Sequence, residues 1–127
     1  MEIKLKLNEV VNINNTLSAI IDDSNTKINI LLKFRLLGIM NAIKSLITNF
    51  EIVKNEKIIE FGKETKDGIY QISKDDKKSL AKFRAEIEKV LDSEVSITVE
   101  PINPEEIIDK GLKSEYLIGL YPIIRQY

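Results

Sequence analysis

Apolar and polar residues alternate in two short segments of the chain, residues 2–7 and residues 94–100. Within each segment every second residue is apolar, which is typical of a strand with one buried face. The apolar positions are Ile3, Leu5, Leu7, Val95, Ile97 and Val99. The pattern therefore predicts one strand near the start of the chain and a second strand in its last third.

A much longer segment, from Lys27 to Phe61, has the helical period. Seven of its apolar residues are separated by alternating steps of four and three residues, as in a packing seam between helices. The seam residues are Leu32, Leu36, Ile39, Ile43, Leu46, Phe50 and Val53. The first half of this helix carries further apolar residues outside the seam, so we expect it to be covered on more than one side. Those residues are Ile30, Leu31, Phe34, Leu37, Met40 and Ile47.

Two shorter segments also have the helical period. The first predicted helix runs from about Glu9 to Asp22, with Asn8 as its N-cap. The other runs from an N-cap at Ser73 to about Asp92. Their apolar stripes consist of Val10, Ile13, Leu17 and Ile20 in the first helix, and Leu80, Phe83, Ile87 and Val90 in the second.

Glycine residues mark the end of the long helix and the turn that follows it. We expect Gly62 to end the helix in a left-handed conformation. In the polar turn "KETKDG", the pair Asp67-Gly68 is the sharpest turn signal. The next four residues, "IYQI", are short and extended.

The C-terminal segment starts with a strong helix signal, since Asn103-Pro104 combines an N-cap with a first-turn proline. This short helix is expected to stop at Gly111. The rest of the segment is apolar and mostly helical at first, and Pro122 is expected to end or kink it.

The lengths of the helices predict how they pack. At a rise of about 1.5 Å per residue the long helix measures on the order of 50 Å, and the shorter helices of about 21 Å and about 27 Å together nearly match it. We therefore expect the long helix to be a spine, with one short helix packed along each half. The two strands then meet near the middle of the spine, where they can pair antiparallel.

This arrangement is a mainly helical α+β fold, with a long central helix in a helical hairpin and a small antiparallel sheet. Residues 1–127 form a single domain, with a projecting hairpin tip at about residues 55–72 and a C-terminal helical segment at residues 103–127. We expect the core to draw on most of these elements. The predicted core residues are Ile3, Leu5, Leu36, Ile39, Ile43, Phe50, Phe83, Ile87, Val95 and Ile97.

Composition excludes several kinds of chemistry. The chain has 19 basic and 20 acidic residues and a net charge of −1, whereas a dedicated nucleic-acid-binding protein usually has a basic excess. It has no Cys and no His, which rules out disulfides, thiolate nucleophiles, Cys/His zinc sites and Ser-His triads. The most basic run, residues 74–84, also contains two aspartates, so we favour a solvated helix start over a contact with phosphates.

Three pairs of adjacent carboxylates remain as candidates for chemistry: Asp22-Asp23, Asp75-Asp76 and Glu105-Glu106. Each pair lies at a predicted helix end or start, where capping and the helix dipole explain it. We favour that interpretation over a hard-cation or acid/base site. No glycine pattern matches a phosphate-binding loop. We therefore expect no catalytic residue, no metal site and no cofactor, and a protein that is not an enzyme.

The sequence also bears on location. Lys33, Arg35 and Lys44 interrupt the long helix, so we do not expect it to span a membrane. The first ten residues, "MEIKLKLNEV", lack the apolar core of a signal peptide. We therefore expect no secretion by a signal peptide.

Residues 31–72 and 83–102 resemble a loose group of short, mostly uncharacterised bacteriophage proteins. In that group a long helix typically leads into a D-x-G-type turn, a second helix that ends in a leucine-acid pair, and then "EVxI". The matching residues are Phe50-Glu51, Lys54, Ile58, Phe61-Gly62, Asp67-Gly68, Leu91-Asp92 and Glu94-Val95-Ser96-Ile97. Phe61 stands where the group usually has tyrosine. The resemblance implies a phage context, in virion assembly or in contact with a host component, and it supplies no active site.

These observations favour a non-enzymatic phage protein that acts through protein–protein contacts as a virion structural or assembly component. The alternative is a small soluble inhibitor of a host protein, that is, an anti-defence factor. Either protein would act in the virion or the host cytoplasm, with a phage or host protein as its partner. The protein could also form a homo-oligomer. A nucleic-acid-associated accessory protein is a third and weaker alternative, and we expect no membrane as a partner.

We expect the partner to bind one of two surfaces. The first is the charged hairpin tip, with Lys57, Glu60, Lys63, Lys66 and Tyr70. The second is the apolar C-terminal segment, whose aromatic and aliphatic residues are typical interface anchors. Its candidate residues are Tyr116, Leu120, Tyr121, Ile124 and Tyr127. The competing interpretation of this segment is that it packs on the protein's own core.

Overall fold

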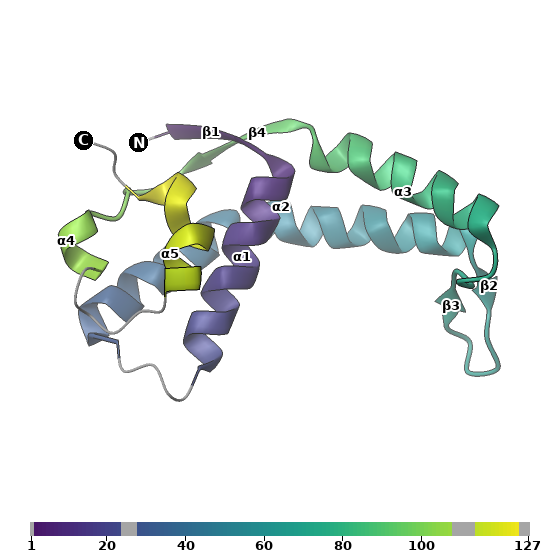
Figure 1. Cartoon of the computed structure of the whole chain (residues 1–127), viewed down its shortest axis with the longest axis horizontal. Helices are drawn as coiled ribbons and strands as arrows, with labels where there is room; N and C mark the ends of the chain where they lie inside the picture. The colour runs from purple at the N-terminus through teal and green to yellow at the C-terminus, as the bar shows by residue number, and fades with distance from the viewer. Residues whose placement is uncertain (1, 24–27, 108–113, 125–127) are drawn as a thin grey trace.

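The computed structural model describes residues 2–23, 28–107 and 114–124 of the chain. It has the expected mainly helical α+β fold, with one long helix and two small antiparallel sheets. The arm, residues 49–92, projects to the right in Figure 1, and the other described residues form a globular head at the left. Both N- and C-terminal elements belong to the head.

The two predicted strands pair as expected. Strand β1 (Glu2–Lys6) lies antiparallel to β4 (Glu94–Thr98), with Ile3 opposite Ile97 and Leu5 opposite Val95. Leu5 and Ile97 are buried, while Ile3 and Val95 are half-buried. The sheet therefore closes the junction between the head and the arm, as the spine arrangement requires.

Helix α1 (Leu7–Asp22) begins directly after β1, so the expectation of Asn8 as N-cap is wrong. The cap position is Lys6, whose backbone N–H donates to Glu9 Oε1 at 3.1 Å. The Leu7 N–H donates to Ser93 O at 2.9 Å and so extends the strand pairing by one residue. Because both N–H groups are satisfied in this way, the chain can turn into a helix without using Asn8.

The long helix α2 (Ile30–Phe61) is the predicted spine. Asn29 caps it, since its Oδ1 accepts from the Leu31 N–H at 2.8 Å. The predicted start at Lys27 lies outside the described residues. Helix α1 packs against α2 within the head, and α3 (Lys77–Leu91) runs back along the arm half of α2 (Figure 1).

The seam residues of α2 make the contact with both shorter helices. Leu32, Leu36, Ile39, Ile43 and Phe50 are buried, and the other two seam residues are half-buried. Most buried side chains lie in the head, and the arm contributes only Phe50 and Ile87 to the buried core. The predicted core is therefore confirmed for its central members, while Ile3, Phe83 and Val95 are half-buried at its edge.

The chain after β4 returns to the head. It forms α4 (Pro104–Ile107), α5 (Ser114–Leu120) and a 3₁₀ helix, η1 (Tyr121–Ile123). Helix α5 packs against α1, and the Ile102 N–H donates to Ile123 O at 2.8 Å. The α-helix ends just before Pro122, as expected, whereas the predicted stop at Gly111 lies outside the described residues.

Two further expectations about caps are wrong. Gly62 is extended, with φ −96° and ψ 180°, and is not left-handed. A residue without a side chain is needed at this position, because a Cβ there would lie 2.8 Å from the carbonyl oxygen of Gln71. The N-cap of α3 is Asp76, whose Oδ1 accepts from the Ser79 N–H at 3.1 Å. Ser73 instead accepts from the Asp75 N–H at 3.2 Å, within the turn before the helix.

The polar turn after α2 is a small hairpin. Strands β2 (Lys63–Glu64) and β3 (Tyr70–Gln71) pair antiparallel. Gly68 has a φ of +76°, a conformation in which glycine avoids the steric cost of a side chain. The predicted turn at Asp67-Gly68 is thus confirmed. Among the described residues, no helix is both long enough and apolar enough to cross a lipid bilayer.

Candidate interaction surfaces

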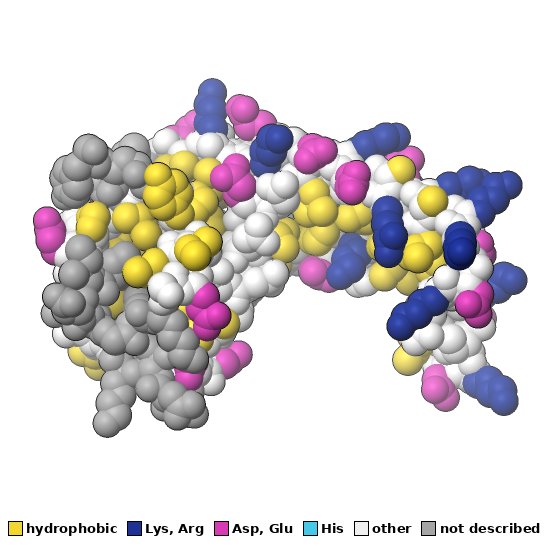
Figure 2. Space-filling model, viewed as in Figure 1, with side chains coloured by type: hydrophobic (Ala, Val, Ile, Leu, Met, Phe, Trp, Pro, Cys, Tyr) yellow, Lys and Arg dark blue, Asp and Glu magenta, His cyan; other side chains and the backbone are white. Residues whose placement is uncertain are grey.

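The hairpin tip is strongly charged. Figure 2 shows Lys and Arg side chains gathered over the arm and its end, with acidic side chains among them. Glu60, Lys63, Lys66 and Tyr70 are exposed, as the expected tip surface requires, and Lys57 is half-buried. These residues therefore lie where a partner can reach them.

Lys57 is held in place by its neighbours on α2. Its Nζ donates to Glu60 Oε2 at 2.8 Å and lies 5.9 Å from the centre of the Phe61 ring. The hydrogen bond to Glu60 raises the pKa of Lys57 above its usual value of 10.5. Because an exposed ion pair of this kind contributes little to stability, both charges are available to an incoming partner at low cost.

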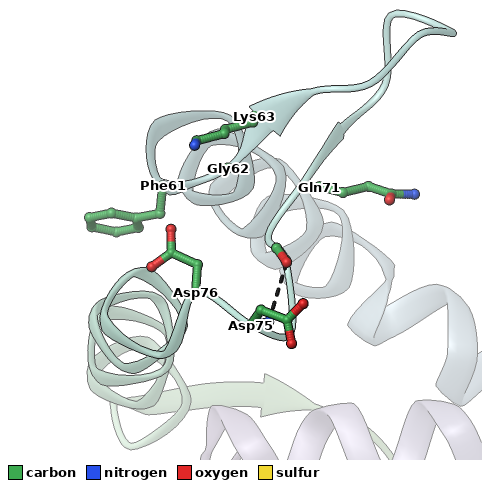
Figure 3. A pocket seen from close by; sticks show the side chains of 7 residues that line it. Phe61, Gly62, Lys63, Gln71, Asp75 and Asp76 are labelled. Carbon is green, nitrogen blue, oxygen red and sulfur yellow. Dashed lines mark hydrogen bonds between the residues drawn. The ribbon is translucent and has the colours of Figure 1, made fainter.

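A hollow of about 450 Å³ lies at the base of the hairpin (Figure 3). Its lining is Phe61, Gly62, Lys63, Gln71, Ser73, Asp75 and Asp76. Hydrogen bonds from Ser79 lower the pKa of Asp76, and the nearby charge of Lys63 adds a smaller effect in the same direction. Asp76 thus acts as a helix cap, and within the part of the chain that the structure describes no three acidic side chains gather as metal ligands.

The C-terminal segment divides into buried and exposed residues. Tyr116 and Leu120 belong to the core, and the Tyr116 hydroxyl donates to Asp23 Oδ2 at 2.8 Å. Their side chains are therefore not available to a partner, and the competing interpretation of core packing holds for them. Tyr121 is 62% exposed and Ile124 is half-buried, while Tyr127 lies outside the described residues.

A third surface was not expected from the sequence. The residues of α2 outside the seam were predicted to be covered, but Ile30, Leu31 and Phe34 are 80%, 72% and 76% exposed. Leu37 is 41% exposed, and Met40 is half-buried. The expectation of cover on more than one side is therefore wrong for this half of α2. The excess of apolar residues was a real signal, but the sequence does not show whether the chain itself covers them.

This exposed face leads into a hollow of about 460 Å³ between α1 and α2. The hollow is lined by Asn14 of α1 and by Leu37, Met40, Asn41, Lys44, Ile47 and Thr48 of α2. We call this lining, together with Ile30, Leu31 and Phe34, the α2 groove.

Arg35 is the one cation of this half of α2 that is tied to the fold. Its guanidinium donates to the carbonyl oxygens of Pro101 at 3.1 Å and Glu100 at 3.4 Å. It therefore fastens the segment that follows β4 to the spine.

Comparison of the chain with protein-family models, with curated proteins and with solved structures finds no match.

Proposed function

We propose that the protein is a non-enzymatic phage protein that acts through protein–protein contacts, as a structural or assembly component of the virion. The observation that carries the proposal is the cluster of large apolar side chains that α2 leaves in water, Ile30, Leu31 and Phe34. A soluble chain gains nothing from such a cluster unless another molecule covers it. The projecting arm supports the same function, because its charged tip adds a second reachable surface.

The phage setting of this proposal comes from the resemblance of residues 31–72 and 83–102 to short phage proteins. The place of action is then the virion or the host cytoplasm.

The alternative function is inhibition of a host protein. The size of the α2 groove favours it, since a hollow of about 460 Å³ fits one segment of a partner. Lattice contacts in a particle are usually broader, and permanent interfaces often bury more than about 2,000 Å².

Quantitative mass spectrometry of purified particles, from the phage that encodes the chain, separates the two functions. A fixed copy number per particle supports the virion component. Absence from particles, with abundant chain in the infected cell, supports the inhibitor.

Site-specific photo-crosslinking tests the protein–protein contact itself. A benzophenone amino acid is placed at Phe34 in the groove, at Lys66 in the tip or at Tyr121 in the C-terminal segment. Lys82, which is exposed on α3, is the control position. We expect a discrete adduct with one protein, during infection, from at least one of the three positions and none from Lys82. Three positions without an adduct would contradict the proposal.

A further inference from the structure

The exposed face of α2 has the spacing of a second packing seam. Its residues recur in steps of four and three, as the buried seam does, but on the opposite side of the helix. They are Ile30, Phe34, Leu37, Asn41, Lys44 and Thr48. At about 1.5 Å per residue this face is about 27 Å long, which is the length of five helical turns. Helix α2 therefore offers a continuous surface for another helix along the head.

The apolar part of this face is large for a protein without a partner. The exposed fractions of Ile30, Phe34 and Leu37 on this face, together with that of Leu31 beside Phe34, leave on the order of 500 Å² of apolar side chain in water, in the upper part of the range for the largest patch on a typical monomer. The hollow beside Leu37 and Met40 gives the patch a depression that a side chain can enter.

The charge of the surrounding chain limits the kind of partner. The described residues 28–50 contain three basic residues, Lys33, Arg35 and Lys44, and no Asp or Glu. Lys44 belongs to the exposed face and Lys33 lies beside it, and neither forms an ion pair with a described residue. Acidic residues return only at Glu51, where the groove ends. An acidic partner is therefore complementary to this face, whereas a second copy of α2 would place like charges against each other.

The walls of the groove decide between a helix and a strand. Both walls are helices, α1 and α2, whose backbone groups are already hydrogen-bonded within each helix. A strand lying there would find no sheet edge and would leave its own N–H and C=O groups without partners. A helix satisfies its backbone internally, and its polar flanks can meet the side chains of Asn14, Asn41 and Thr48.

We infer that the α2 groove binds one amphipathic helix of a partner protein, with apolar residues facing α2 and acidic residues on its flanks. The apolar anchors recur at i, i+3 or i+4, and i+7, and the acids lie close to Lys33 and Lys44. This inference rests on the proposed function, since it names the surface and the partner chemistry of the same protein–protein contact.

The test uses two fluorescein-labelled synthetic peptides of 18 residues and the full-length protein. Both peptides are alanine-based helices with leucines at i, i+4, i+7 and i+11, and they differ only in having glutamate or lysine on the flanks. By fluorescence anisotropy we expect the glutamate peptide to bind at least about tenfold more tightly than the lysine peptide.

Variants of the protein locate the binding. Phe34→Ser should weaken the glutamate peptide about tenfold or more, because it removes an apolar anchor contact. Lys44→Glu should weaken the glutamate peptide and strengthen the lysine peptide. The matched control is Ile118→Ser on α5, where the side chain is 77% exposed, and it should leave both affinities unchanged. All three positions are at the surface, and circular dichroism melts check that each variant is folded.

Four results would overturn the inference. Equal affinities for the two peptides would remove the charge argument, and unchanged affinity in Phe34→Ser would place the binding elsewhere. A parent protein that sediments as a dimer, and a Phe34→Ser variant that sediments as a monomer, would assign the face to a second copy. If crosslinks during infection form from Lys66 or Tyr121 and not from Phe34, the proposed function stands and this inference fails.

Discussion

Single residues at the middle of the spine carry much of the stability of the head. Ile43 is fully buried in the core cluster, to which the β1–β4 sheet, α1 and α2 all contribute residues. We predict that Ile43→Asp unfolds the protein, because it buries a charge without a partner. The control is Phe34→Asp on the exposed side of the same helix, which should melt close to the parent in circular dichroism. Similar melting curves for Ile43→Asp and the parent would mean that the middle of the spine is not buried.

A second residue-scale prediction concerns the hydrogen bond between α5 and the end of α1. Tyr116→Phe removes the hydroxyl that donates to Asp23 Oδ2. The acceptor is a carboxylate, and hydrogen bonds to charged groups contribute more to stability than those between neutral groups. We expect a loss of about 1–2 kcal/mol in the free energy of unfolding, measured by urea denaturation. Tyr70→Phe, in the exposed hairpin, should change it by less than about 0.5 kcal/mol. Equal effects of the two changes would contradict the assignment of Tyr116 to the core.

At the scale of elements, the glycine within α2, Gly38, and the glycine that follows α2, Gly62, should respond to alanine with changes in stability of opposite sign. A Cβ at Gly62 would press on backbone oxygens of Ile58 and Gln71, whereas a Cβ at Gly38 meets nothing within 4 Å. We predict that Gly62→Ala destabilises the protein by about 1–3 kcal/mol, and that Gly38→Ala stabilises it by about 0.5–1 kcal/mol, because alanine is the better helix former. Thermal and urea unfolding measure both changes. Stabilisation by both changes would mean that the chain near Gly62 relaxes around the added methyl group, and destabilisation by both would contradict the open space at Gly38.

The start of α3 gives a pH-dependent prediction. The pKa of Asp76 is below 3.8 in the folded protein, so its contribution to stability is present above pH 3.8 and is lost as the pH falls through the folded value. Asp76→Ala should therefore lower the melting temperature at pH 7, and the difference from the parent should shrink below pH 3.8. Ser73→Ala should have little effect at either pH. A larger loss of melting temperature in Ser73→Ala than in Asp76→Ala would mean that Ser73 is the cap.

The sequence predicted the elements better than their ends or their exposure. Apolar residues alternate with polar ones in β1 and β4, and they recur with the helical period in the seam of α2. Because each of these segments has a single period, the sequence was sufficient to predict the two strands, their antiparallel pairing and the long helix. The caps were harder to predict, because carboxylates within three residues of Asn8 and Ser73 accept hydrogen bonds more strongly than these side chains do. Glu9 accepts from the N–H of Lys6, the cap position of α1, and Asp76 itself caps α3. For the candidate surfaces, an apolar residue such as Phe34 or Leu120 looks the same in the sequence whether the chain covers it or leaves it exposed.

For the whole molecule, the uneven distribution of the core predicts uneven dynamics. The arm holds only two buried side chains, Phe50 and Ile87, whereas α1 alone buries five. Regions with few buried apolar contacts open at lower free energy. We therefore expect hydrogen–deuterium exchange to be faster in α3 and in the β2–β3 hairpin than in α1. Slower exchange in α3 would mean that the arm is covered in solution, for instance by another molecule.

The length of α2 sets one further property of the molecule. Helix α2 runs without interruption for 32 residues, from within the head to the base of the hairpin. At about 1.5 Å per residue, the two ends of this helix lie about 48 Å apart. There is no linker along this path, so the distance is fixed by the number of residues and not by a hinge. The number of residues in the two arm helices therefore sets how far the tip lies from the head. Adding seven residues to α2 and seven to α3 would move the tip outward by about 10 Å and leave it facing nearly the same way.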